Sequence, residues 1–349
     1  MAESDSGSHS PWREGNVWII ANPIAGGWWG RRRRGAAIRF LKSRLHVGEV
    51  RWTQRRGDAE QWAREAAAGN VGLVICSGGD GTINEIANGL AGSPVALGIL
   101  PAGTANVIAC ELGIPFDPVK ATVCILKGRT ERLHIGCAEY QPLAAEPVTP
   151  DFPSSFILHP SSFHRRYFLF AAGVGFDAAV CRHVNTAFKH WGHKLAYCID
   201  GLRLFVRYRS PRLHVALDGA APAACSELIV AKARCYAGRF HVAPDASLRK
   251  PDLDACMFLR PGRWNLVRYA LGIARGKHTT YSDVLCRKAQ SIEVADDNPA
   301  YLQLDGDAVG TTPVRLTLLR DALSVVVPFG DNPFADPSVE TRRQDAARE

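Results

Sequence analysis

The chain has 349 residues, of which 46% are hydrophobic and 22% are charged, and its formal net charge is +8. This composition is typical of a globular protein with enough chain for two domains. No run of about 18 apolar residues occurs, and the N-terminal stretch lacks an apolar h-region, so the sequence predicts neither a transmembrane helix nor a secretory signal.

The positive charge and the cysteines restrict the expected partners and compartment. A net charge of +8 attracts polyanions such as nucleic acid, nucleotides or an anionic membrane face. No RNA-recognition, zinc-finger or helix-turn-helix signature accompanies this charge, so we expect no nucleic-acid partner. The 10 cysteines include no C-x-x-C pair, which argues against a zinc site and favours reduced thiols in the cytoplasm.

The first third of the chain alternates between strand-like and helix-like segments. Short apolar runs bounded by turn residues predict strands, and longer segments with helical spacing of apolar residues predict helices. In chain order we expect a strand at 16–23, a helix at 31–45, a strand at 49–54, a helix at 58–69, a strand at 71–77, a helix at 82–92, a strand at 95–101, and helices at 104–113 and 117–128. This alternation predicts parallel pairing in an α/β layer fold.

Beyond residue 129 the pattern changes to many short β-like runs. A Pro- and Ser-rich insertion occupies 141–165, and helical segments are expected near 177–208 and 263–275. Many short strands with turn residues predict an antiparallel β-sandwich. The expected organisation is a disordered N-terminus (1–14), an α/β domain (15–129), a β-rich domain (130–328) and a disordered C-terminus (329–349).

Three loops rich in small residues should open on one edge of the parallel sheet, because each follows a predicted strand. They are the NPIAGG segment from Asn22, the segment from Ser77 to Thr82, and the segment that contains Gly103, Thr104 and Asn106. Each loop leads into a helix, and helix N-termini offer N–H donors and partial positive charge to phosphate. Together the loops favour a polyphosphate site, with plain tight turns as the alternative interpretation.

The motifs together resemble a known family. GGDGT followed by INEIANGL, then GILPAGTAN, with NPIAGG upstream and GFDAAV, PDASL and LDGD downstream, resembles the diacylglycerol kinase catalytic family, which includes bacterial soluble lipid kinases and the sphingosine and ceramide kinases. The resemblance covers residues 16 to 328. It implies an N-terminal α/β domain, similar to that of NAD kinases, that binds ATP, and a C-terminal β-sandwich domain with lipid and metal contacts. It also implies phosphoryl transfer from ATP to a lipid hydroxyl with Mg²⁺.

The resemblance assigns roles to individual residues. It places the nucleotide against Asn22, Pro23, Ile24, Ala25, Gly26, Thr53, Gly78, Gly79, Asp80, Gly81, Thr82, Ile83, Asn84 and Thr104. Asp80 is also a candidate catalytic residue, acting either on Mg²⁺ that bridges the phosphates or as an acceptor that organises its loop. Asp305 of LDGD corresponds to the family's proposed general base, because a carboxylate can accept the proton of an attacking alcohol. Asp307 stands where many relatives have Glu.

A metal site is expected from the resemblance alone. Asp252, in KPDLD, aligns with a metal-linked acid of the family, and Leu253 stands where the family usually has Gly. Mg²⁺ at this position would need oxygen ligands, partly water and main-chain carbonyls.

A lipid substrate requires contact with a membrane surface. The basic and aromatic segment 188–209 and the pair Trp28–Trp29 beside Arg31–Arg34 are candidates for this contact, and a core-packing helix is the alternative for 188–209. We expect an ATP-dependent lipid kinase in the cytoplasm, peripheral to the inner face of the membrane, that acts on diacylglycerol or a related lipid alcohol such as a sphingoid base. A kinase of a soluble metabolite and a non-catalytic nucleotide- or membrane-binding regulator are the alternatives, and a homodimer is left open.

Overall fold

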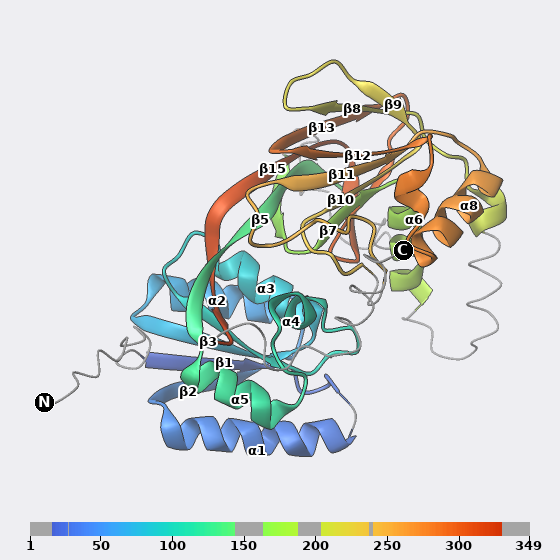
Figure 1. The fold of residues 1–349 in the computed structure, drawn as a ribbon. Coiled ribbons are helices and arrows are strands. Elements are labelled where there is room, and N and C mark those ends of the chain that lie inside the picture. Colours follow the sequence, from blue (N-terminus) through green and yellow to red (C-terminus); the bar gives the residue numbers. More distant parts are fainter. Residues whose placement is uncertain (1–15, 27, 144–162, 188–203, 237–239, 330–349) are drawn as a thin grey trace, which may run out of the picture. The chain divides into compact units, whose positions relative to one another are not determined.

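The computed structural model describes residues 16–26, 28–143, 163–187, 204–236 and 240–329 (Figure 1). The two termini expected to be disordered, most of the 141–165 insertion and most of the 188–209 segment lie outside the described residues. The chain divides into two units. The first contains the residues up to Leu133 and those from Asp321 onward, and the second contains His134–Arg320.

The first unit is built on a parallel sheet. Its strands are β1 (Asn16–Ala21), β2 (Val47–Trp52), β3 (Val71–Gly78) and β4 (Ala96–Pro101), in the order β4-β3-β1-β2. The end of the long strand β15 (Asp307–Val327) pairs in parallel with β4. β1, β3 and β4 are almost wholly buried, which explains their continuous apolar runs, because strands of a parallel sheet are covered on both faces.

Five helices accompany this sheet. They are α1 (Trp28–Arg44), α2 (Asp58–Ala68), α3 (Asp80–Leu90), α4 (Val107–Leu112) and α5 (Pro118–Lys127). Figure 1 shows α1 and α5 on one face of the sheet and α2 and α3 on the other. Asp117 caps α5, since its Oδ1 accepts hydrogen bonds from Val119 N (3.0 Å) and Lys120 N (3.1 Å), and Pro118 occupies the first helical position.

The second unit is formed by antiparallel strands. In chain order they are β5 (Arg129–Pro142, which begins in the first unit), β6 (His164–Phe168), β7 (Ala171–Val174), β8 (Leu213–Leu217), β9 (Ala223–Cys225), β10 (Glu227–Ala231), β11 (Leu253–Phe258), β12 (Val284–Ala289), β13 (Ser291–Asp296), β14 (Tyr301–Leu304) and the first part of β15. The order of neighbouring strands is β12-β11-β10-β7-β14-β15, and β13 pairs with both β15 and β8. Their inward residues, such as Phe168, Leu228 and Leu302, form one large apolar core. The predicted change from parallel to antiparallel pairing is confirmed.

The described helices of the second unit include α6 (Phe176–Ala187), α8 (Arg263–Ala274) and the short 3₁₀ helix η1 (His278–Thr280). α8 corresponds closely to the helix predicted at 263–275. Within the described part of the chain, no helix combines the length and the apolar character needed to cross a bilayer.

Candidate active site

The loops that follow the parallel strands meet at the carboxyl edge of the sheet in the first unit. Asn22 N, after β1, donates to Ser77 O of β3 (2.9 Å), and Ala102 N, after β4, donates to Gly78 O of β3 (2.9 Å). The three loops predicted to share one edge therefore do so, because each leaves a neighbouring strand of one parallel sheet.

The first loop is held by the side chain of Asn22. Its Oδ1 accepts a hydrogen bond from Ile24 N (3.0 Å), which makes an Asx turn, and its Nδ2 donates to Thr82 Oγ1 on α3 (3.4 Å). Thr53, directly after β2, joins the same edge through a hydrogen bond from its N to Ala21 O (2.9 Å). Residues from four strand ends are thus connected in one network.

Glycine is required in these loops for two different reasons. A Cβ atom on Gly78 would lie 2.6 Å from Cβ of Thr82, and one on Gly103 would lie 2.7 Å from Cα of Gly79. Gly78 thus makes room for the Thr82 side chain in its own β3–α3 segment, and Gly103 lets the β4–α4 loop pack against Gly79. A Cβ atom on Gly81 would meet nothing within 4 Å, so this exposed position in the first turn of α3 has open space beside it. The structure thus separates the glycines needed for packing from the one that leaves room for a ligand.

Asp80 links two helices of the site. It is the first residue of α3, and its Oδ1 accepts a hydrogen bond from Ile108 N in the first turn of α4 (3.3 Å). Burial raises the pKa of Asp80, and hydrogen bonds from the backbone N–H groups of Val107, Ile108 and Asn106 act in the opposite direction. As an acceptor, Asp80 thus fixes the start of α4 beside its own loop.

The remaining residues expected at the nucleotide differ in exposure. Pro23, Ile24, Gly26, Gly81 and Thr104 are exposed, Asn22, Ala25, Thr53, Gly79 and Asp80 are half-buried, and Gly78, Thr82, Ile83 and Asn84 are buried. The Ile83 side chain is 0% exposed, so it packs in the core and contributes to the site only through its backbone.

A pocket of about 580 Å³ lies beside these loops in the first unit. It is lined by Gly26, Arg33, Arg34, Pro101, Ala102, Gly103, Asn106, Phe116, Asp117 and Pro118. Arg34 is only 4% exposed, and its Nη1 donates to Ala25 O (2.7 Å), so the first loop and the pocket share a buried cation. Phosphate is a suitable ligand for a guanidinium held in this way.

Arg34 was not among the residues selected from the sequence for the nucleotide site. The run Arg31–Arg34 reads as a solvated basic face, because four adjacent cations rarely point inward. The helical spacing does contain the signal, since Arg34, Ala37, Ile38 and Leu41 recur at the interval of one helix face and all four are buried.

In the second unit, the Asp305 carboxylate is hydrogen-bonded to backbone N–H groups. Its Oδ2 accepts from Leu169 N (2.7 Å), and its Oδ1 accepts from Phe170 N (2.9 Å) and Ala171 N (3.0 Å). The backbone of Asp305 adopts a φ of 51°, a left-handed conformation that Asp tolerates in turns. The carboxylate expected to act as a general base therefore holds the β14–β15 turn against the start of β7.

A second set of side chains fixes the same turn. Gly306 N donates to Gln303 Oε1 (2.7 Å), and Gln303 Nε2 donates to Asp177 Oδ2 on α6 (2.8 Å). Gln303 is 1% exposed, and burial raises the pKa of Asp177. Asp307 is half-buried and begins β15, so it is the other acid on this well-fixed turn.

Glu227, at the start of β10, is a buried acid that sequence reasoning did not select. It is 6% exposed, and it accepts hydrogen bonds from Phe176 N (2.5 Å) and Tyr208 Oη (3.0 Å). Burial raises the pKa of Glu227 to about 8, and the two hydrogen bonds only partly offset that effect. This acid therefore changes charge near neutral pH.

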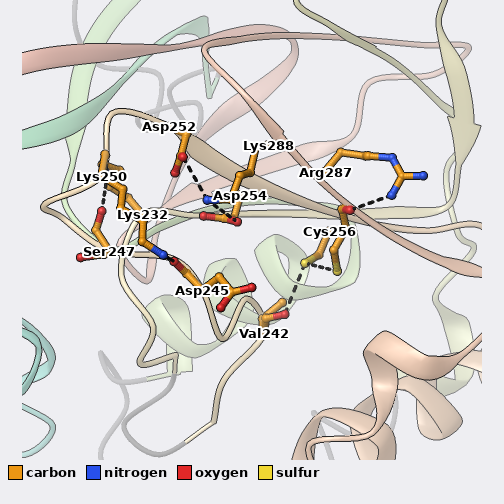
Figure 2. Close-up of polar contacts among 11 residues, drawn as sticks. Lys232, Val242, Asp245, Ser247, Lys250, Asp252, Asp254, Cys256, Arg287 and Lys288 are labelled. Carbon is orange, nitrogen blue, oxygen red and sulfur yellow. Dashed lines mark hydrogen bonds and ion pairs between the residues drawn. The ribbon is translucent and has the colours of Figure 1, made fainter.

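The residues around Asp252 do not fit a metal ion. Asp252 Oδ2 accepts from Lys288 Nζ (2.9 Å), and the same ammonium lies 3.8 Å from Asp254 Oδ1 (Figure 2). Among the described residues, no group of three or more His, Cys, Asp or Glu side chains could hold a metal. One lysine thus pairs with both acids at the position where the resemblance implied Mg²⁺.

Comparison with known proteins agrees with this architecture. Residues 16–138 match the family described as the diacylglycerol kinase catalytic domain, and residues 171–327 match the YegS C-terminal NAD kinase beta sandwich-like domain. A diacylglycerol kinase of Bacillus subtilis (strain 168) is 27% identical over 89% of this chain and 95% of its own. A diacylglycerol kinase of Staphylococcus aureus (strain JH9) is 26% identical over 89% of this chain and 91% of its own.

Solved structures share the fold. A structure from Bacillus anthracis str. Sterne superposes with a TM-score of 0.71 at 21% identity, covering 93% of this chain and 98% of that one. A diacylglycerol kinase structure from the same organism gives a TM-score of 0.63 at 19% identity, over 90% and 97% of the two chains. The predicted α/β unit followed by a β-sandwich is confirmed. The chain thus carries a diacylglycerol kinase catalytic domain at residues 16–138, followed by a YegS-type C-terminal domain at residues 171–327, and it is a kinase that resembles the diacylglycerol kinases.

Proposed function

We propose that this kinase transfers the γ-phosphate of ATP to the hydroxyl group of a lipid, with diacylglycerol or a related lipid alcohol such as a sphingoid base as the acceptor. One observation carries the proposal: the loops after β1, β3 and β4 are hydrogen-bonded to each other at one sheet edge, where Gly81 leaves open space beside the start of α3. The names of the relatives, diacylglycerol kinase, support the choice of acceptor.

The nucleotide phosphates would bind at the first turn of α3. The leading N–H groups of a helix have no acceptor within the helix, and the helix dipole favours negative charge there. Gly81 permits close approach to this backbone, and the buried Arg34 adds a positive charge at the adjoining pocket. ATP therefore suits this edge better than an uncharged ligand.

Mg²⁺ would belong to the nucleotide rather than to Asp252. When bound to the phosphates, Mg²⁺ neutralises the charge that develops on the transferring group. Asp80 is the carboxylate that the Gly78–Asn84 loop offers to this ion, and its bond to Ile108 N fixes its position before ATP arrives. A carboxylate that is held in place in this way costs no reorganisation during the reaction.

We propose that Asp307 accepts the proton of the lipid hydroxyl, and that Asp305 shapes the turn that carries Asp307. Asp305 uses three of its roughly four lone-pair sites on backbone N–H donors, which ties its carboxylate to the shape of the turn. Asp307 lies two residues further along the turn that Asp305 and Gln303 hold rigid. General-base assistance of this kind contributes about 10²- to 10⁴-fold.

The enzyme would reach its substrate through α8. Trp264 is 84% exposed and Leu271 is 46% exposed, and their seven-residue spacing places both on the face opposite the buried Tyr269 and Gly272. This α8 outer face consists of Trp264, Val267, Ala270, Leu271 and Ala274.

The charged residues around the α8 outer face indicate which kind of membrane surface it would bind. The segment 259–282 contains Arg260, Arg263, Arg268, Arg275 and Lys277 and no Asp or Glu. Arg260 and Arg268 pair with Asp283, whereas Arg263, Arg275 and Lys277 are exposed around the apolar face. Trp and Leu beside exposed cations favour an anionic bilayer surface. The segment 188–209 lies mostly outside the described residues, as do the side chains of Trp28 and Trp29.

A substrate panel tests the proposed reaction. The purified enzyme is supplied with ATP and Mg²⁺, together with either a panel of lipid alcohols in mixed micelles or a panel of soluble metabolites, and the products are identified by mass. Phosphorylated lipid is expected. Phosphorylation of a soluble metabolite that is indifferent to micelles would instead identify a metabolite kinase with the same fold.

A further inference from the structure

Lys232 is a buried lysine in the second unit that the proposed reaction does not use. It directly follows β10, is only 1% exposed, and is among the largest fully buried side chains of the described residues. Its backbone N donates to Phe170 O (2.8 Å), so its position next to β7 is fixed. Lysine is almost never buried to this extent unless its ammonium group has partners, because removing the charge from water is costly.

The Lys232 ammonium donates to two main-chain carbonyls. Nζ donates to Ser247 O (2.5 Å) and to Lys250 O (2.7 Å), as Figure 2 shows. Both carbonyls belong to the segment 245–252, which leads into β11 and which we call the 245–252 turn. Lys250 N also donates to Ser247 O (3.1 Å), so the turn closes on itself around the ammonium group.

This arrangement has the chemistry of a cation site. Carbonyl oxygens from nearby residues of one turn, converging on a single positive charge, are the ligands that hard metal ions take in proteins. An ammonium group supplies up to three hydrogen bonds to such oxygens and one positive charge. The Lys232 ammonium therefore supplies the positive charge that a bound cation would offer to the carbonyl oxygens of the 245–252 turn.

The last residue of the turn, Asp252, and the nearby Asp254 also pair with a lysine. Lys288 Nζ lies 2.9 Å from Asp252 Oδ2 and 3.8 Å from Asp254 Oδ1. Besides Arg287, Figure 2 labels six charged residues of this region: Asp245, Asp252, Asp254, Lys232, Lys250 and Lys288. Their formal charges cancel, so the region has no net negative charge to attract a divalent ion. Asp252 Oδ1 and Asp254 Oδ2 are buried without a hydrogen-bond partner, and they are the atoms that a metal ion could still use.

We propose that the Lys232 ammonium is the built-in cation of the 245–252 turn, and that this chain needs no structural divalent ion there. The inference goes beyond the proposed reaction, and its readout is stability rather than phosphoryl transfer. If the inference about Lys232 fails, the proposed phosphoryl transfer is therefore unaffected, and the reverse also holds.

The wild-type protein provides the first test. Thermal unfolding is followed without nucleotide after chelator treatment and again with millimolar Mg²⁺, and the metal content of the desalted protein is measured. We expect equal Tm values and far less than one ion per chain. A Tm raised by Mg²⁺, with a stoichiometric ion that is lost in Asp252→Asn, would overturn the proposal.

The second test removes the charge. Lys232→Met keeps the length of the side chain but leaves two buried carbonyls without the ammonium group, so Tm should fall by about 5 °C or more. Lys250→Met is the matched control, because Lys250 is exposed and its Nζ donates to one carbonyl of the same turn, Asp245 O (2.7 Å). The control should change Tm by less than about 2 °C. A Lys232→Met protein as stable as wild type would contradict the proposal.

A third variant tests the replacement itself. Lys232→Ala leaves Ser247 O and Lys250 O with room for a hydrated ion. Recovery of its Tm by Mg²⁺, with no such effect on wild type or on Lys250→Met, would support the substitution of a lysine for a metal. If the Lys232 variants do not fold, the metal content and the Mg²⁺ response of the wild-type protein still decide the question.

Discussion

Gly79 and Gly103 approach so closely that a Cβ atom on Gly103 would lie 2.7 Å from Cα of Gly79. The two glycines come from different loops, one before α3 and one after β4. Gly103→Ala should therefore force the loops apart and lower the free energy of unfolding by about 1–3 kcal/mol, as overpacking does. Chemical denaturation measures this change, and an unaltered midpoint would show that the loops do not pack as described.

Gly81→Ala should behave in the opposite way. Its Cβ atom would meet nothing within 4 Å, and alanine is favoured over glycine in a helix, so stability should be kept or rise by up to about 1 kcal/mol. The KM for ATP should rise roughly tenfold, because the methyl group would enter the space assigned to the phosphates. An unchanged KM would place the phosphates elsewhere.

The two acids of the β14–β15 turn should respond differently to amidation. Asp307→Asn should lower kcat about 10²- to 10⁴-fold and leave Tm near the wild-type value, because it removes a proton acceptor. Asp305→Asn should lower Tm, because its NH₂ group replaces one carboxylate oxygen and would face either Leu169 N or the N–H groups of Phe170 and Ala171 without accepting from them. Full activity of Asp307→Asn would return the acceptor role to Asp305.

Glu227 should make stability depend on pH. Its pKa is raised from 4.5 to about 8 by burial, so the folded state holds a proton that the unfolded state has released over this interval. The resulting stabilisation is complete below pH 4.5 and is lost as pH rises through about 8. The unfolding free energy of wild type should therefore fall relative to Glu227→Gln by up to about 1.4 kcal/mol per pH unit in this window. A difference between the two proteins that stays constant from pH 5 to about 9 would contradict this assignment.

Membrane contact through α8 can be tested apart from catalysis. Replacing Trp264 and Leu271 together by Ser should weaken binding to vesicles that contain anionic phospholipid by roughly tenfold or more, because it removes most of the exposed apolar surface of the α8 outer face. Trp52→Ser is the control, since Trp52 is a 46% exposed tryptophan on β2 in the other unit. Binding that is insensitive to salt, or equal for neutral vesicles, would argue against an electrostatic role of the surrounding cations.

Local patterns were sufficient to predict much of the first unit. The NPIAGG, GGDGT and GTAN loops follow strands in sequence, and parallel pairing fixes which ends of those strands share an edge, so their meeting could be predicted without coordinates. Helix boundaries were less accurate, and α1 and α3 begin three and two residues before the predicted starts at 31 and 82. Capping is decided by backbone geometry that composition does not show.

Contacts between distant segments could not be predicted from local patterns. Asp305 reads as one residue of a hairpin turn, yet its partners Leu169, Phe170 and Ala171 precede it by 134–136 positions. Lys232 reads as a surface lysine at the end of a strand, and only the fold shows that its ammonium group meets Ser247 and Lys250. Burial of a polar group depends on long-range packing, which one sequence does not reveal.

The most direct test of the central claim follows the labelled γ-phosphate of ATP in the presence of Mg²⁺ and micelles that contain diacylglycerol, with wild type and Asp307→Asn in parallel. Wild type should move the label into an organic-phase product with the mass of the phosphorylated lipid, and Asp307→Asn should form this product at least about a hundredfold more slowly. Label that never enters any lipid, while ATP is consumed with a soluble acceptor, would show that the enzyme is not a lipid kinase.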